Sequence, residues 1–288
     1  MQYSEHRVTA TDSQQLFVRH YSPPSGVACG RTLFIVHGTS EHGGRYRHVA
    51  EVAVSQGWDV ICPDLRGHGH SDGIAVHVER FDQYLQDFDT LWRFFEVNPD
   101  RTALLGHSFG GLVSARFAQT RPSKLAALVL MSPLLGLRVK IDPLTYALGR
   151  TMSYVAPRTR FKSKVPPGST CRCPEVLQRR DTDPLIHRSV TARWFFEMKR
   201  ALRDVAQDAP RLRASVLAFQ AGADLIVAPE AVEPWLQTVG TDDREFRMFA
   251  GHYHELLNEP TWPDTLAALL NWLAPRLACV PTRAKAGF

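Results

Sequence analysis

The 288-residue sequence lacks the features that mark several large classes of protein. Its five cysteines are scattered and odd in number, which argues against a disulfide framework. No apolar run approaches the roughly 18 residues that a membrane-spanning helix requires. Residues 1–15 lack the basic-then-apolar order of a signal peptide, and no internal repeat is found. We therefore expect a cytoplasmic globular protein.

Metal-binding patterns are also incomplete. Cys171 and Cys173 resemble half a metal site, but no second cysteine pair or nearby histidine completes it. His252 and His254 lie two positions apart, and no third ligand accompanies them. We predict no metal at either place.

Acidic residues are scarce between Gly136 and Asp204, where fifteen Lys and Arg accompany six Asp and Glu. This balance of +9, within a net charge of +5, leaves −4 for the rest of the chain. Such a segment can bind nucleic acid, an anionic membrane surface or an acidic substrate group, or it can be a solvated helical surface. No nucleic-acid-binding motif accompanies the charge, so we predict no nucleic-acid partner, and peripheral membrane contact stays open.

Strands and helices alternate along most of the chain. A short apolar run rich in β-forming residues predicts a buried strand at 31–38, and further strands are predicted at 58–65, 102–108, 125–133, 215–224 and 244–251. Apolar residues at helical spacing predict helices at 45–56, from Phe81, from about Gly110 and from Trp262. This alternation is typical of parallel strands covered by helices on both faces.

The alternation stops after Pro133 and resumes near Ala209. The intervening residues are basic and proline-rich, with helical stretches but no convincing core strand. We therefore predict one α/β domain, formed by residues 1–133 and 210–279, with a helical cap inserted at 134–209. Residues 280–288 are predicted to be a disordered tail.

The strongest chemical signal is the motif Gly106-His107-Ser108-Phe109-Gly110, which matches G-x-S-x-G between a predicted strand and a predicted helix. A nucleophilic serine needs a tight, strained turn that exposes its Oγ, and the glycines Gly106 and Gly110 allow neighbouring chains to approach. The N-terminus of the following helix directs N–H groups toward developing negative charge. Ser108 is therefore the candidate nucleophile.

A serine nucleophile needs a base and an acid that orients the base, and in this architecture the acid precedes the histidine. Asp224 follows a strand at the carboxyl edge of the predicted sheet, whereas Asp242 and Asp243 precede a strand and are typical of a turn. We favour Asp224. Position alone leaves His252 and His254 both open as the base.

An oxyanion hole requires two backbone N–H donors. One is expected from Phe109, directly after the nucleophile, and the other from Thr39, in the loop after the first core strand. His37 and His42 precede the serine, and we expect His37 to support the loop. Serine chemistry of this kind needs no metal or organic cofactor.

Five motifs together resemble the α/β-hydrolase family, and within it the monoacylglycerol lipase/lysophospholipase-like branch of serine aminopeptidase S33-like hydrolases. They are "HGTSEHGGRY" (37–46), "PDLRGHGHSDG" (63–73), "GHSFGG" (106–111), "GADLIV" (222–227) and "YHELLNE" (253–259). The resemblance implies a mostly parallel eight-stranded sheet flanked by helices, with the cap after the sixth strand. It also implies His254 as the base, with His252 at the pocket rim, and a bracing role for Glu41, His42, Arg45 and Tyr46.

The resulting hypothesis is a serine hydrolase that cleaves carboxylic esters of lipid-like substrates, such as monoacylglycerol or lysophospholipid, through an acyl-enzyme. A short-chain carboxylesterase, an aminopeptidase, a carbon–carbon hydrolase and a cofactor-free haloperoxidase-like enzyme keep the same three residues and stay open. A non-catalytic binding protein on the same scaffold would be expected to lack one of them. An epoxide hydrolase or haloalkane dehalogenase would carry Asp at position 108.

Overall fold

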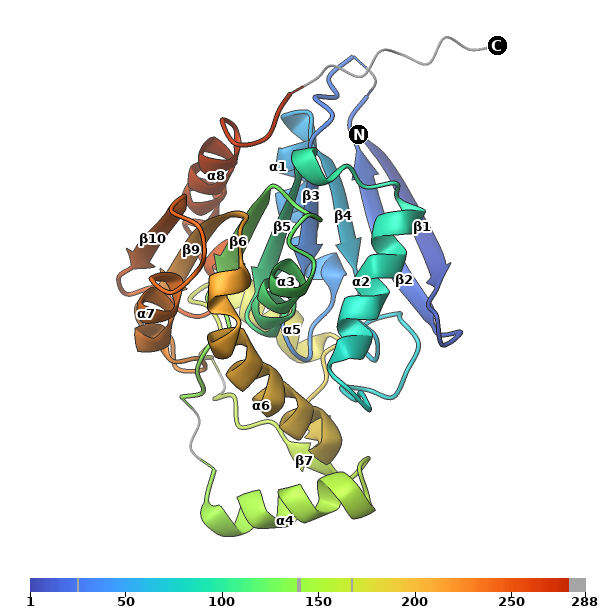
Figure 1. Cartoon of the computed structure of the whole chain (residues 1–288), viewed down its shortest axis with the longest axis vertical. Helices are drawn as coiled ribbons and strands as arrows, with labels where there is room; N and C mark the ends of the chain where they lie inside the picture. The colour runs from blue at the N-terminus through green and yellow to red at the C-terminus, as the bar shows by residue number, and fades with distance from the viewer. Residues whose placement is uncertain (25, 139–140, 167, 280–288) are drawn as a thin grey trace.

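The computed structural model describes residues 1–24, 26–138, 141–166 and 168–279. The predicted tail at 280–288 lies outside these ranges. Eight strands form one sheet in the order β1-β2-β4-β3-β5-β6-β9-β10 (Figure 1). Their bounds are Gln2–Thr9 (β1), Gln15–Ser22 (β2), Thr32–Val36 (β3), Asp59–Pro63 (β4), Thr102–His107 (β5), Ala127–Met131 (β6), Ser215–Ala221 (β9) and Arg244–Phe249 (β10). The pairs from β4 through β10 are parallel, whereas β2 pairs antiparallel with both β1 and β4.

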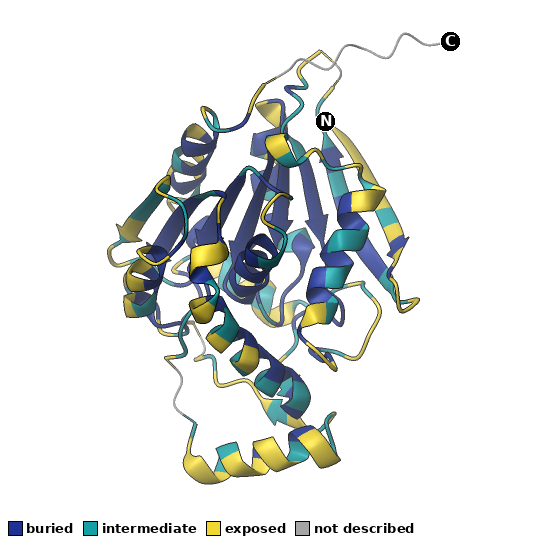
Figure 2. Cartoon of the chain, viewed as in Figure 1, coloured by how far each residue is buried: buried dark blue, intermediate teal, exposed yellow. Residues whose placement is uncertain are grey.

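Alternation along each central strand builds two hydrophobic cores. In β3, Phe34 and Val36 pack into one core and Leu33 and Ile35 into the other, all fully buried. This follows from the period of two in side-chain direction along a strand. The predicted mostly parallel sheet with both faces covered is confirmed (Figure 2).

Helices on each face close these cores. Helices α2 (Asp82–Phe94) and α3 (Phe109–Thr120) contribute to the core that contains Phe34. Helices α1 (Arg47–Ser55) and α8 (Trp262–Leu273) contribute to the core on the opposite face. A short helix, α7 (Val232–Leu236), lies between β9 and β10 in sequence.

The first strand, β1, leaves little trace in the hydrophobic pattern, whereas β2 carries the buried run Leu16, Phe17 and Val18. In β1 only Val8 is buried, because this strand forms the edge of the sheet and is mostly exposed. Because neither face of β1 is covered along most of its length, its sequence needs no alternation of apolar and polar residues. For this reason the apolar pattern marks the inner strands but not β1.

Residues 134–209, which we call the inserted segment, separate β6 from β9. Their elements are α4 (Pro143–Val155), β7 (Arg160–Lys162), α5 (Pro174–Thr182), β8 (Ser189–Thr191) and α6 (Ala192–Gln207). The strands β7 and β8 pair only with each other among the described residues, so the large sheet gains nothing from them. The segment lies beyond the carboxyl ends of the parallel strands, with α4 at the end of the molecule opposite the N-terminus (Figure 1).

Helix α6 attaches the inserted segment to the domain. Trp194, Met198, Ala201 and Val205 follow one another at helical spacing and are buried in the core that also contains α3. The Oγ1 of Thr191 accepts a hydrogen bond from the Trp194 amide at 3.3 Å and caps the first turn. Within the described ranges, no helix combines the length and apolar character needed to cross a bilayer.

Candidate active site

Ser108 occupies a strained turn between β5 and α3. Its backbone angles, φ 53° and ψ −119°, lie in a region that L-residues rarely adopt. Its amide donates to the Met131 carbonyl at 3.0 Å, and its own carbonyl accepts from the amides of Gly111 at 2.9 Å and Leu134 at 2.9 Å. These bonds hold the turn where the carboxyl end of β5 meets the first turn of α3.

The two motif glycines have no room for a side chain. A Cβ at Gly106 would lie 2.5 Å from the Gly110 carbonyl oxygen, and one at Gly110 would lie 2.4 Å from the carbonyl oxygens of Val36 and His37. The backbone of α3 therefore sits directly against the end of β3. This close approach brings the Ser108 turn next to the loop at residues 37–46, which we call the 37–46 loop.

Asp224 and His254 form a buried pair. The Nδ1 of His254 lies 2.7 Å from Oδ2 of Asp224, and the two residues are 4% and 0% exposed. A carboxylate only accepts, so Nδ1 carries the proton and Nε2 is left with a lone pair. The other oxygen of Asp224 accepts from the amides of Ile226 at 2.8 Å and Val227 at 3.1 Å.

The charge on Asp224 is stabilised in this position. Burial acts to raise its pKa, but the electrostatic interaction with His254 and the hydrogen bonds from His254 and the two amides outweigh burial and hold the pKa below its usual value. Asp224 therefore stays ionised at neutral pH. An ionised, immobile carboxylate can orient an imidazole and stabilise its protonated form.

The alternative acid and base lie elsewhere. Asp243 accepts hydrogen bonds from Ser215 and Arg276 at the amino end of β10, and Asp242 is exposed at the same turn. His252 binds Thr261 Oγ1 at 2.8 Å, and it is not among the described residues that line the cavity around Ser108. The expectation that His252 lies at the pocket rim is therefore not supported.

The cavity around Ser108 has a volume of about 830 Å³. Gly38, Thr39, Ser108 and His254 contribute to its wall from the sheet side. The inserted segment contributes a largely apolar wall that includes Tyr146, Phe161, Trp194, Phe195, Phe196 and Met198. Trp194 also belongs to the core, so it serves both packing and cavity lining.

The 37–46 loop is held by side chains that face away from the sheet. His37 is fully buried; its Nε2 accepts from the Leu65 amide at 2.9 Å, and its Nδ1 therefore donates to the Gly38 carbonyl at 2.7 Å. Burial lowers the pKa of His37, so the ring is neutral and structural. The Gly38 amide donates to Glu41 at 2.6 Å.

The amides of Thr39 and Phe109 remain available. Neither donates a hydrogen bond to any residue that the structure describes, outside the first turn of α3. Phe109 directly follows Ser108 in sequence, and Thr39 lines the same cavity as Ser108. Two unused amides next to a serine are the requirement for binding an oxyanion.

Glu255 is a site residue that the sequence pattern did not reveal. It forms a bidentate ion pair with Arg45, 210 positions earlier in the chain, at 2.6 and 3.0 Å. No local spacing predicts a contact of that separation. The only sequence signal was the charge itself, a Glu directly after the candidate base.

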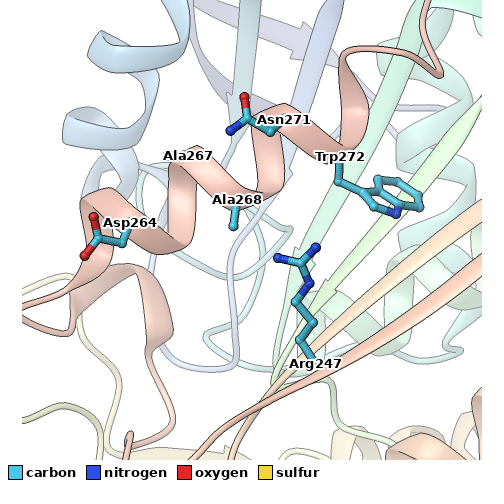
Figure 3. Close-up of a pocket in the computed structure, with 6 residues that line it drawn as sticks. All are labelled: Arg247, Asp264, Ala267, Ala268, Asn271 and Trp272. Atoms are coloured by element: carbon cyan, nitrogen blue, oxygen red, sulfur yellow. The ribbon is translucent and has the colours of Figure 1, made fainter.

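A second hollow, of about 510 Å³, lies between α8 and β10 (Figure 3). Its wall consists of Arg247, Asp264, Ala267, Ala268, Asn271 and Trp272. None of these side chains is a serine, cysteine or histidine. The nucleophile-and-base arrangement therefore belongs to the first cavity.

The strand order, the strained serine turn and the buried Asp–His pair at the carboxyl edge of the sheet define an α/β-hydrolase. The chain belongs to the family described as serine aminopeptidase, S33, which matches residues 29–261. The predicted family is thereby confirmed.

Relatives support the same class. Phospholipase YtpA of Bacillus subtilis (strain 168) is 30% identical over 242 residues, which cover 82% of this chain and 92% of that protein. Monoacylglycerol lipase of Mycolicibacterium smegmatis is 27% identical over 284 residues, which cover 95% of this chain and 98% of that protein. The crystal structure of Paleococcus ferrophilus monoacylglycerol lipase has a TM-score of 0.83 and 27% identity, covering 91% and 99%. The chain is a carboxylic ester hydrolase, as the sequence predicts.

Proposed function

We propose that Ser108, His254 and Asp224 form a catalytic triad that hydrolyses single-chain lipid esters. The observation that carries the proposal is the buried Asp224–His254 pair, with His254 and the strained Ser108 on the wall of one cavity. A serine, an imidazole with a free Nε2 and an ionised carboxylate are the three groups that acyl transfer requires.

In this mechanism Nε2 of His254 takes the proton of Ser108 as Oγ attacks the ester carbonyl carbon. The carbonyl oxygen becomes an oxyanion that accepts hydrogen bonds from the Thr39 and Phe109 amides. When the tetrahedral intermediate collapses, the carbon–oxygen bond to the alcohol breaks and His254 returns the proton to that alcohol. Water, deprotonated by His254, then attacks the acyl-enzyme and releases the fatty acid and Ser108.

We propose that the inserted segment is a cap that binds the acyl chain. Its apolar wall faces the sheet-side residues across the cavity, and about 830 Å³ lies within the range of pockets that enclose one small ligand. Each buried methylene contributes ~0.8 kcal/mol, so kcat/KM should rise about fourfold per added CH₂ until the cavity is full. Monoacylglycerols and lysophospholipids, each with one acyl chain, fit this description.

An aminopeptidase is disfavoured by the charges in the cavity. Such an enzyme needs a free carboxylate to bind the substrate ammonium group. The described acidic residues of the lining are Glu41, Asp181 and Glu255, and each lies within ion-pair distance of an arginine. These contacts support an ester in preference to a peptide.

The test of the triad combines labelling with turnover. An alkyl fluorophosphonate should modify Ser108, identified by peptide mass spectrometry, and Ser108→Ala should lose on the order of 10⁴- to 10⁶-fold in kcat/KM toward monoacylglycerol. Ser163→Ala, a cavity serine from the inserted segment, is the control and should retain activity. Full activity in Ser108→Ala would refute the proposal.

We further propose that α4 contacts an anionic membrane surface. Leu144, Leu148 and Val155 recur on one side of the helix and are 80%, 51% and 70% exposed. Most of this helix is coloured as exposed in Figure 2. Arg150, on the same helix, and Arg158, three residues after its end, are also exposed. An apolar helical face bordered by cations is typical of helices that lie in the lipid interface. The free thiols of all five cysteines support a cytoplasmic location for this contact.

Vesicle binding tests the membrane contact. The protein should sediment with phosphatidylglycerol vesicles more than with phosphatidylcholine vesicles, and Leu144→Ser with Leu148→Ser should reduce that binding. Met248→Ser is the matched control, because Met248 is 48% exposed on β10, remote from α4. Equal vesicle binding by the double variant and the control would show that α4 does not form the membrane contact.

A further inference from the structure

Three buried charged side chains connect the 37–46 loop with the loop that carries His254. Glu41, Arg45 and Glu255 have side chains that are 6%, 9% and 6% exposed. Glu41 and Arg45 belong to the first loop, and Glu255 directly follows the candidate base. All three reach the cavity wall.

A continuous path of hydrogen bonds runs through these side chains. The Gly38 amide donates to Glu41 Oε1 at 2.6 Å, and Arg45 donates to the other oxygen of Glu41. Arg45 also donates to both oxygens of Glu255, at 3.0 and 2.6 Å. The path therefore begins one residue before Thr39 and ends one residue after His254.

Each end of the path has further attachments. Tyr46 donates its hydroxyl to Glu41 at 2.9 Å, and Asn258 donates its side-chain amide to Glu255 at 2.9 Å. The Glu255 amide donates to the Thr170 carbonyl of the inserted segment at 2.7 Å. The guanidinium of Arg180 lies 3.9 Å from Glu255. The acidic groups are thus held from several sides, which leaves them one geometry.

All three groups stay charged at neutral pH. Burial acts to raise the pKa of both glutamates, but the adjacent guanidinium of Arg45 outweighs it and keeps both values below normal. Removing the guanidinium alone would leave two buried carboxylates without the cation that they share, which is strongly destabilising. Its planar, bidentate geometry also fixes the distance between the two carboxylates.

We infer that Arg45, held by Glu41 and Glu255, is a positioning residue that sets the distance between the oxyanion donors and the base. This inference rests on the proposed triad. The two loops come from opposite ends of the chain, and the transition state needs both at once, the Thr39 amide at the oxyanion and His254 at the moving proton. An ion pair that joins them acts on the transition state through the two loops.

The experiment compares two conservative substitutions at matched ion pairs. Arg45→Lys keeps the charge but loses the bidentate geometry. Arg66→Lys makes the same change at Arg66–Asp87, a bidentate pair at 2.6 and 2.5 Å with side chains 6% and 5% exposed, outside the cavity lining. Both variants should lose thermal stability, so a comparison of their kinetics separates positioning from folding.

We expect Arg45→Lys to lower kcat about 10- to 100-fold toward a short-chain ester while KM stays within about threefold. The affinity for an alkylboronic acid, whose boron binds the serine oxygen as a tetrahedral adduct, should fall by a similar factor. Arg66→Lys should leave kcat and boronate affinity unchanged. Glu255→Gln, which keeps one acceptor oxygen for Arg45, should show a smaller loss of kcat than Glu255→Leu, which keeps none.

Unchanged kcat and boronate affinity in folded Arg45→Lys would overturn the inference, as would equal kinetic losses in Arg45→Lys and Arg66→Lys. If Arg45→Lys does not fold, Glu255→Gln and Glu255→Leu decide, since equal activity in these two removes the positioning role. Failure of the triad itself would appear separately, as a wild-type protein that the fluorophosphonate does not label at Ser108.

Discussion

The site at the edge of the sheet and the inserted segment follow different physical rules. Ser108, Asp224 and His254 are buried, Asp224 and His254 are hydrogen-bonded to each other, and the strand β5 behind them is fully buried. In the inserted segment, α5 has no buried residue and α4 exposes several large apolar side chains. The first region keeps the three candidate catalytic side chains in fixed positions. The second region supplies an exposed apolar surface and one wall of the cavity. Chemistry should therefore depend on the first region and substrate choice on the second.

The sharpest test of this comparison is the base. His254→Ala should lower kcat/KM on the order of 10⁴- to 10⁶-fold, because proton transfer from Ser108 loses its acceptor. His252→Ala, two residues away, should change it less than about threefold, since His252 contacts Thr261 and does not line the cavity. Steady-state hydrolysis of one soluble ester measures both. The reverse result would assign the base to His252.

Replacing the candidate acid, Asp224, is expected to lower activity somewhat less than replacing the candidate base, His254. Asp224→Asn should reduce kcat about 10⁴-fold, because an amide at that position favours the wrong imidazole tautomer. Asp243→Asn breaks an ion pair with Arg276 at the amino end of β10, away from the candidate site, and should leave kcat unchanged. A small effect at Asp224 together with a large one at Asp243 would exchange their roles.

The wall of the inserted segment should affect substrate binding and not chemistry. Phe196→Ala removes an apolar side chain from the cavity and should lower kcat/KM for a long-chain monoacylglycerol about tenfold, with little change for a short-chain ester. Leu144→Ala, on the exposed side of the same segment, should leave both substrates unaffected in the absence of membranes. Equal losses for short and long chains would contradict the division between the two regions.

The smallest expected effect is on stability and depends on pH. The folded pKa of Asp224 lies below its ordinary value of 3.8, so its ionised form stabilises the fold above that value, and the contribution is lost as pH falls through the folded pKa. The difference in free energy of unfolding between wild type and Asp224→Asn should therefore shrink from pH 7 to pH 3. Urea unfolding measures it, with the exposed Asp242→Asn as control. A difference that grows toward low pH would contradict the stabilising role of the charge.

Much of the domain could be predicted because its signals are local. The runs at 31–38 and 102–108 are apolar on both faces, as strands buried between two helical layers must be, and β3 and β5 lie within them. The motif around Ser108 needs its glycines because a Cβ at Gly106 or Gly110 would clash with nearby backbone oxygens. Strand β1 was not predicted, because an exposed edge strand has no need of an apolar pattern.

The assignment of catalytic roles to Ser108, Asp224 and His254 stays a prediction, which the variants above would test. The sequence order and the motifs pointed to these three residues, and the structure brings Asp224 and His254 into contact across 30 positions. Position alone favoured His254 over His252 only weakly, because the two residues share one loop, and the resemblance of residues 253–259 to the family motif made the choice. Only the fold turns one of them toward Asp224.

The sequence by itself determined the class of fold, the order of the motifs and the place of the insertion, because burial on a strand or helix face imposes a short period on the residues. Tertiary structure alone decided how large the cavity is and that Arg45 joins Glu41 to Glu255. These are contacts between loops far apart in the chain. Their energies depend on distance and desolvation in three dimensions, and neither quantity leaves a periodic trace in the sequence.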